Sequence, residues 1–62
     1  MNYIQLGLGR NVNKYRNLKN FTQEQLSEKL NISVKHLSAV ERGKVFPSSS
    51  LIMRISHQLQ VS

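Results

Sequence analysis

The side chains that could carry out chemistry are few, and their spacing does not assemble a reactive centre. The chain has 62 residues, no cysteine, two histidines and three acidic residues, all of them glutamates. No carboxylate stands at metal-ligand spacing near His36 or His57, and no Ser/His/acid or paired-carboxylate arrangement can be built. No strand pattern precedes the Gly7-Leu8-Gly9 stretch, so it does not predict a dinucleotide loop. We therefore expect no catalytic site, metal, cofactor or small-molecule substrate.

The net charge of the chain limits the classes of partner that it is expected to bind. Nine Lys and Arg residues against three Glu residues give a net charge of +6. A small basic domain is suited to phosphate-bearing partners, with nucleic acid first and an anionic membrane surface second, although some domains are basic only for solubility. No apolar run approaches the roughly 20 residues that span a bilayer, and no signal peptide is evident. Together with the absence of cysteine, this favours a cytoplasmic protein without a membrane partner.

The elements that must position any binding residues are helices. Apolar residues recur at spacings of three and four, which predicts helices over about 8–18, 23–30 and 34–42. Ser48 or Ser49 opens a fourth helix. The expected inner face of the first helix comprises Leu8, Val12, Tyr15 and Leu18; that of the fourth comprises Ile52, Ile55 and Leu59, flanked by Leu51 and Met53.

The second helix has a well-defined start. Thr22 is a good N-cap, and Gln25 three residues later completes a capping box. Phe21 before the cap and Leu26 after it have the spacing of a hydrophobic staple. These signals predict a short helix that begins at Gln23.

A three-residue turn separates the second and third helices. Asn31 tolerates the left-handed conformation that ends helices, and Ser33 is again an N-cap. Ser27 is small enough for two helices to cross closely. The positions that fix the crossing angle are apolar: Leu26, Leu30, Ile32, Leu37 and Val40. Two short helices joined in this way make a helix-turn-helix over about 22–42, whose second helix suits the DNA major groove.

From Val12 to Ser62 the sequence resembles the Cro/C1-type (XRE) helix-turn-helix family of bacterial and phage repressors. The matching residues are Arg16, Phe21-Thr22-Gln23, Leu26, Leu30, Ile32-Ser33, Leu37-Ser38, Glu41-Arg42-Gly43, Pro47-Ser48, Ile55, Leu59 and Val61-Ser62. The resemblance implies that residues 1–62 form a compact all-α, lambda-repressor-like DNA-binding domain of four or five helices. Its recognition helix spans about 34–42, and its function is transcriptional regulation, as a repressor. Asn31 and Ser27 depart from the family's usual Gly and Ala, and both suit the same geometry.

The resemblance also assigns roles to individual residues. It implies a largely buried ion pair between Arg16 and Glu41, and a buried carboxylate needs such a partner. It places Gln23 at a helix N-terminus against a DNA phosphate, and Arg42 and Lys44 at further phosphate contacts.

Base recognition is expected from the exposed, early face of the third helix. That face comprises Ser33, Val34, Lys35, Ser38 and Ala39. Val34 suits a thymine methyl group, unless it is an isolated surface valine, and Lys35 suits guanine or a phosphate. Ala39 permits close approach of the helix to the bases.

Two further expectations concern partners. Members of this family pair on DNA, so the partner is an operator bound by a homodimer, and many members continue beyond the position of Ser62, which suggests the N-terminal part of a longer regulator. The alternative from another functional class is an antitoxin-type protein-interaction module on the same fold. A basic amphipathic segment that folds only on membranes is argued against by the well-formed helix starts.

Overall fold

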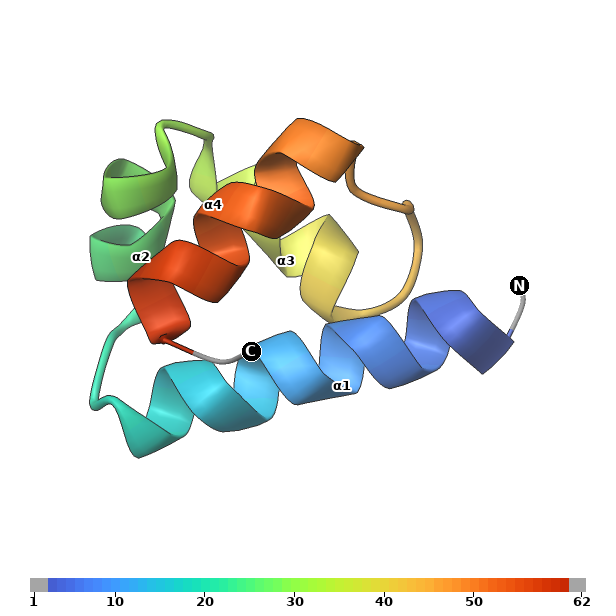
Figure 1. The fold of residues 1–62 in the computed structure, drawn as a ribbon, viewed down its shortest axis with the longest axis horizontal. Coiled ribbons are helices and arrows are strands. Elements are labelled where there is room, and N and C mark those ends of the chain that lie inside the picture. The colour runs from blue at the N-terminus through green and yellow to red at the C-terminus, as the bar shows by residue number, and fades with distance from the viewer. Residues whose placement is uncertain (1–2, 61–62) are drawn as a thin grey trace.

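A computed structural model of the protein describes residues 3–60, in which the secondary structure consists of four α-helices. They are α1 (Tyr3–Leu18), α2 (Gln23–Leu30), α3 (Val34–Glu41) and α4 (Ser49–Leu59) (Figure 1). The predicted all-α class is confirmed, with four helices rather than five in this part of the chain. Val61 and Ser62, which belong to the family resemblance, lie outside the described residues.

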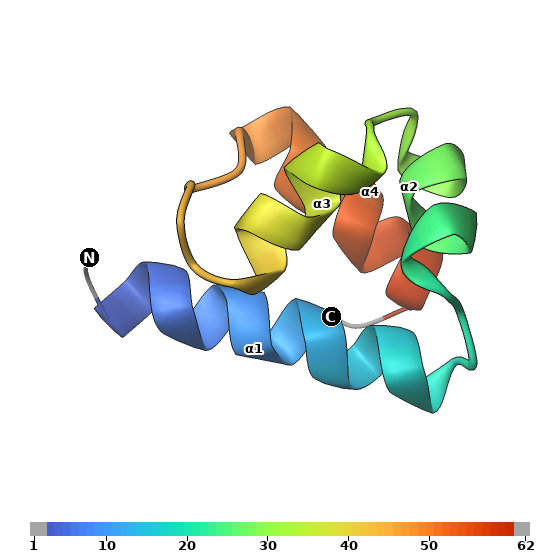
Figure 2. The same cartoon turned by 180° about the vertical axis from the view of Figure 1, so that it is seen from behind.

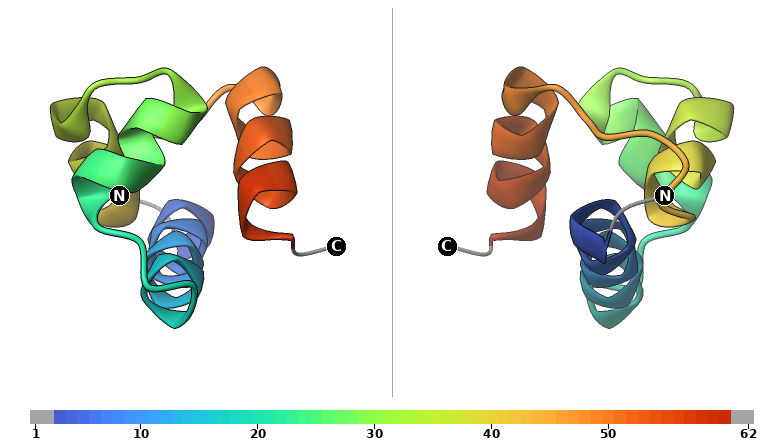
Figure 3. Two further views of the ribbon diagram at one scale, coloured as in Figure 1. Left: turned by 90° about the vertical axis from the view of Figure 1, so that its left-hand side faces the viewer. Right: turned by 90° about the vertical axis from the view of Figure 1, so that its right-hand side faces the viewer.

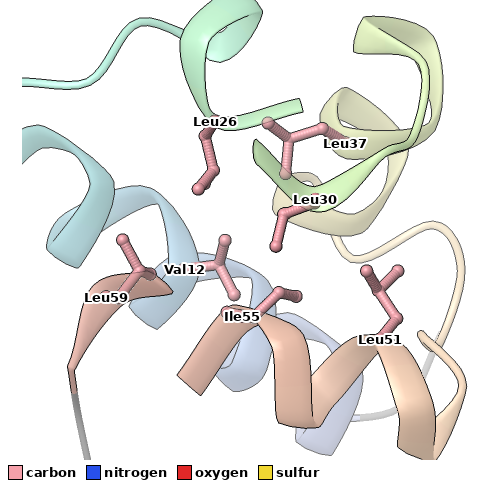
Figure 4. Close-up of a cluster of buried hydrophobic side chains, with 7 residues drawn as sticks. All are labelled: Val12, Leu26, Leu30, Leu37, Leu51, Ile55 and Leu59. Carbon is pink, nitrogen blue, oxygen red and sulfur yellow. The ribbon is translucent and has the colours of Figure 1, made fainter. Parts of the chain in front are cut away.

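All four helices contribute to one hydrophobic core. Its buried members are Val12, Leu26, Leu30, Leu37, Leu51, Ile55 and Leu59 (Figure 4). Four half-buried apolar side chains pack against this cluster: Leu8, Tyr15, Phe21 and Ile32. Helices as short as α2 and α3, eight residues each, are marginal in isolation, so this shared core supplies much of their stability.

The first helix is longer than its sequence pattern predicts. It begins at Tyr3 and runs through both Gly7 and Gly9, whereas the sequence places its start at about Leu8. Gly9 is buried where α1 meets α3, and a Cβ atom built there would lie 2.4 Å from the Val40 carbonyl oxygen. This glycine therefore marks a close helix–helix approach rather than a helix boundary.

The predicted caps of α2 and the turn after it are confirmed. Thr22 and Gln25 form the reciprocal capping box, with hydrogen bonds of 3.0 and 2.9 Å. Asn31 follows α2 with φ 58° and ψ 44°, the left-handed conformation that asparagine tolerates better than most other residues with a side chain. Ser33 then caps α3 by accepting a hydrogen bond from the His36 amide at 3.0 Å.

The inner faces of α1 and α4 differ from the predicted ones. Leu18, the last residue of α1, is 65% exposed, and Asn20 follows it with a positive φ of 60°. In α4 the buried stripe is Leu51, Ile55 and Leu59, while Ile52 is half-buried and Met53 is exposed. Ser48 is the N-cap, and the packing of α4 against α2 and α1 places Leu51 rather than Ile52 in the core.

The two glycines of α1 give a matched test of the α1–α3 contact. We expect Gly9→Ala to destabilise the fold by about 1–3 kcal/mol, because the new methyl group meets the backbone of Val40 and Glu41. Gly7→Ala meets nothing within 4 Å and should stabilise the helix by about 1 kcal/mol. Urea denaturation followed by circular dichroism measures both changes, and equal effects of the two substitutions would contradict this packing.

Candidate nucleic-acid interface

The third helix has one face in the core and one face directed to solvent. Leu37 and Val40 are fully buried, with exposed fractions of 0% and 1%. The proposed base-contacting residues lie on the rest of the helix surface: Ser33, Val34 and Lys35 are exposed, and Ser38 and Ala39 are half-buried. Figure 2 shows this helix at the front of the molecule with α4 behind it. The N-terminal end of α3 is therefore accessible to a partner.

The exposed surface of α3 and the loop after it carries cations without a free carboxylate. Lys35, Arg42 and Lys44 are all exposed, whereas Glu41, the one acidic residue of α3, is only 8% exposed. The Arg42 Nε donates to the Ser38 carbonyl oxygen at 3.4 Å, which keeps the start of its guanidinium group close to the C-terminal turn of α3. This surface suits an anionic partner.

Side chains from three helices meet at the Glu41 carboxylate. We call Glu41 and its three hydrogen-bond donors, Arg16, Asn13 and Gln23, the Glu41 cluster. Arg16 donates from Nε to Oε2 at 2.7 Å and from Nη2 to Oε1 at 3.2 Å. Asn13 of α1 and Gln23 of α2 donate to Oε1 at 2.9 and 3.1 Å. Arg16 also donates from Nη1 to the Phe21 carbonyl at 2.9 Å. The ion pair that the family resemblance implies is thus present, and Glu41 accepts two further hydrogen bonds, from Asn13 and Gln23, in addition to it.

The environment of Glu41 sets its ionisation. Burial by itself raises the pKa of this carboxyl, because leaving water disfavours the charged form. The hydrogen bonds from Arg16, Asn13 and Gln23 act in the opposite direction, as does the positive charge of the guanidinium. These favourable interactions dominate, so the pKa of Glu41 lies below its ordinary value and the group is charged at neutral pH.

Gln23 occupies the first turn of α2, where free backbone N–H groups are available. Its side-chain amide donates one hydrogen bond to Glu41 at 3.1 Å. A primary amide has two N–H donors, and this hydrogen bond uses one of them. The structure therefore connects Gln23 to the third helix, a contact that no pattern in the sequence predicts.

Two residues with contacts between helices, Asn13 and Arg54, were not predicted from the sequence. Asn13 stands three positions before Arg16 on the same helix, and that spacing is the signal that could have linked it to the ion pair. Arg54 of α4 donates from Nη1 to the Leu30 carbonyl at the end of α2, at 2.6 Å. No local sequence pattern predicts this hydrogen bond, because Arg54 bonds to a backbone oxygen 24 positions away.

The described residues can also be compared with the requirements of a metal site, a ligand groove and a membrane span. Over residues 3–60, no three His, Cys, Asp or Glu side chains gather closely enough to hold a metal ion. A groove of about 260 Å³ between α1 and α4 is lined mainly by apolar side chains, with Tyr15 as its one ionisable residue. None of the helices in this part of the chain has the length and apolar character that crossing a bilayer requires.

Taken together, α2, the turn at Asn31 and α3 form a helix-turn-helix, with α2 and α3 crossing steeply (Figure 3). A helix-turn-helix family profile matches residues 12–62. The chain accordingly belongs to the Cro/C1-type (XRE) helix-turn-helix family, and its domain is a DNA-binding domain of that family.

Two relatives agree with this assignment. The uncharacterized HTH-type transcriptional regulator YazB of Bacillus subtilis (strain 168) is 39% identical over 54 residues, which cover 87% of this chain and 78% of that protein. The uncharacterized HTH-type transcriptional regulator MJ0272 of Methanocaldococcus jannaschii is 45% identical over 42 residues, which cover 68% of this chain and 64% of that protein. Both names describe transcriptional regulators.

The lowered pKa of Glu41 predicts acid sensitivity. A carboxyl group with a lower pKa in the folded state than in the unfolded state stabilises the fold above the unfolded value of about 4.3. That contribution is lost as the pH falls through the folded-state pKa. We expect the urea midpoint to be flat from pH 7 to about 5.5 and then to decrease. The control Glu28→Gln removes an exposed carboxylate outside the Glu41 cluster and should leave most of this decrease in place.

Breaking the ion pair should be costly at neutral pH. Glu41→Gln leaves the Arg16 guanidinium, whose side chain is 11% exposed, without a counter-charge. We expect a loss of about 3–5 kcal/mol in the free energy of unfolding at pH 7, measured by urea denaturation. A loss no larger than that of Glu28→Gln would show that the cluster does not hold the helices together.

Proposed function

We propose that this protein is a transcriptional repressor that binds a specific duplex-DNA site by inserting the N-terminal end of α3 into the major groove. The observation that carries the proposal is the orientation of α3: its apolar face is in the core and its polar, basic face is in solvent. An α-helix fits the major groove, where each base pair presents a distinct pattern of donors and acceptors. A domain covering such a site would repress by excluding other proteins from that DNA.

Base recognition is assigned to Ser33, Val34, Lys35, Ser38 and Ala39. Val34 is 38% exposed at the start of the helix, where its methyl groups suit the C5-methyl of a thymine. Lys35 has three donors for guanine O6 and N7. The hydroxyl groups of Ser33 and Ser38 are short donors and acceptors, and the small side chain of Ala39 lets the helix approach the bases.

Phosphate contacts are assigned to Gln23, Arg42 and Lys44, which flank that face. Gln23 begins α2, whose N-terminal end favours an anion through its free N–H groups and its dipole. Arg42 and Lys44 follow α3 as exposed cations. These contacts fix the position of the domain on the duplex and supply affinity that is independent of sequence.

The operator is proposed to contain two half-sites occupied by a homodimer. One module of this size buries only about 600–1,000 Å² of its surface on DNA, which gives weak binding. Two copies on half-sites about one helical turn apart, roughly 34–36 Å, would double the interface. We place this regulator in the cytoplasm with its DNA, and assign it no enzymatic activity.

Substitutions of Lys35 and Lys44 by alanine distinguish base recognition from phosphate contact. Both replace a lysine by alanine, so the two changes remove the same chemical group at different places. After a binding site has been selected from a random DNA pool at stated salt, Lys35→Ala should change the order of affinities among variants of that site. Lys44→Ala should weaken all sequences alike and reduce the slope of log affinity against log salt by about 0.9. Fluorescence anisotropy across a panel of single-base variants measures both effects.

Identical effects of the two substitutions on every sequence would contradict this assignment of roles. Selection that enriches no sequence, combined with tight binding to a protein partner in the absence of DNA, would instead favour the antitoxin-type interaction module.

A further inference from the structure

The C-terminal end of α2 receives a hydrogen bond from outside the helix-turn-helix. The amides of Asn31 and Ile32 already pair with carbonyl groups of the last turn of α2, at 3.1 Å to Glu28 and 3.0 Å to Ser27. The Leu30 carbonyl is bonded instead by Arg54, whose Nη1 donates to it at 2.6 Å from the middle of α4. Figure 1 shows α4 beside α2, and the two helices pack against each other.

This carbonyl belongs to the peptide group that controls the turn. The Leu30–Asn31 peptide plane rotates with the φ angle of Asn31, which is 58°. An L-residue occupies this left-handed region less readily than glycine does, because its Cβ atom crowds the backbone. A charged donor that fixes the Leu30 oxygen also fixes the orientation of that plane, and therefore the direction in which α3 leaves the turn.

We propose that Arg54 is a positioning residue for DNA recognition: its guanidinium holds the Leu30–Asn31 peptide so that α3 projects at the angle that base recognition requires. The interaction is charge-assisted and is also favoured by the partial negative charge at the C-terminal end of α2. Arg54 acts through the backbone of the turn and lies on α4, outside the residues assigned to DNA contact. The inference rests on the proposed function for its effect on DNA, whereas the contact itself is testable without DNA.

The main test compares Arg54→Met with Arg10→Met. Both remove one positive charge from an exposed helix position while keeping a good helix former, and Arg10 lies on α1 away from the turn. Arg54→Lys retains a charged donor and serves as the conservative variant. Two quantities are measured for each protein: amide hydrogen exchange at Asn31 and Ile32, and the ratio of affinities for the selected DNA site and for unrelated DNA.

We expect R54M to accelerate exchange at Asn31 and Ile32 by about tenfold relative to amides in the middle of α1. We expect the affinity ratio for selected over unrelated DNA to fall by about tenfold, and R54K to recover most of both losses. R10M should leave the exchange rates and the ratio near their wild-type values, because it removes charge without touching the turn.

A double-mutant cycle with Asn31→Gly distinguishes positioning of the turn from general stabilisation. Glycine adopts the left-handed conformation without the Cβ penalty. R54M should therefore lower the free energy of unfolding by less in the N31G background than in the wild type. A general packing role of Arg54 would give additive effects. If R54M does not fold alone, the whole cycle is carried out in the Gly7→Ala background, where the stabilising change lies on α1 away from the turn; non-additivity there supports the positioning role and additivity contradicts it.

Exchange rates in R54M equal to those in R10M, or additive effects in the cycle, would overturn the proposal. Its failure is distinguishable from failure of the proposed function. If the wild type prefers no DNA sequence, the function is wrong, and the exchange rates and the cycle measured on stability still decide whether Arg54 holds the turn.

Discussion

The buried carboxylate of Glu41 is the interaction on which the rest of the structure depends. It lies at the end of α3 and accepts hydrogen bonds from Arg16, Asn13 and Gln23, so it connects the third helix to the first and the second. An unpaired buried charge would be strongly destabilising, so the donors around this carboxylate stabilise the packing of the three helices. The same contacts fix the C-terminal end of the helix whose other end is proposed to enter DNA.

Ordering four short helices around such a small core requires sharply defined ends. Residues in the left-handed conformation follow α1, α2 and α4, at Asn20, Asn31 and Gln60, and Gly43 has φ 73° after α3. Serine and threonine side chains cap the N-terminal ends of α2, α3 and α4. These caps and left-handed residues end each helix where the chain turns. The hydrophobic core then stabilises the packing of the four helices against one another.

The third helix shows how one element serves both the fold and recognition. Leu37, Val40 and Glu41 face inward, while Lys35 and Arg42 face solvent. The two remaining acidic residues, Glu24 and Glu28, lie on α2, so the exposed surface of α3 carries no negative charge that would repel phosphate groups. The excess of positive charge seen in the composition is thus matched by the absence of carboxylates on this particular surface.

Local sequence patterns are sufficient to predict the helical class, the capping box at Thr22 and Gln25 and the turn at Asn31, because those signals act between residues a few positions apart. The buried face of α4, the close approach of α3 at Gly9 and the set of donors around Glu41 depend instead on how the helices pack in three dimensions. Asn13 and Glu41 are 28 positions apart, and Arg54 bonds a backbone oxygen 24 positions away. Such contacts depend on how complete helices pack, and the spacing of side chains along one helix does not contain that information.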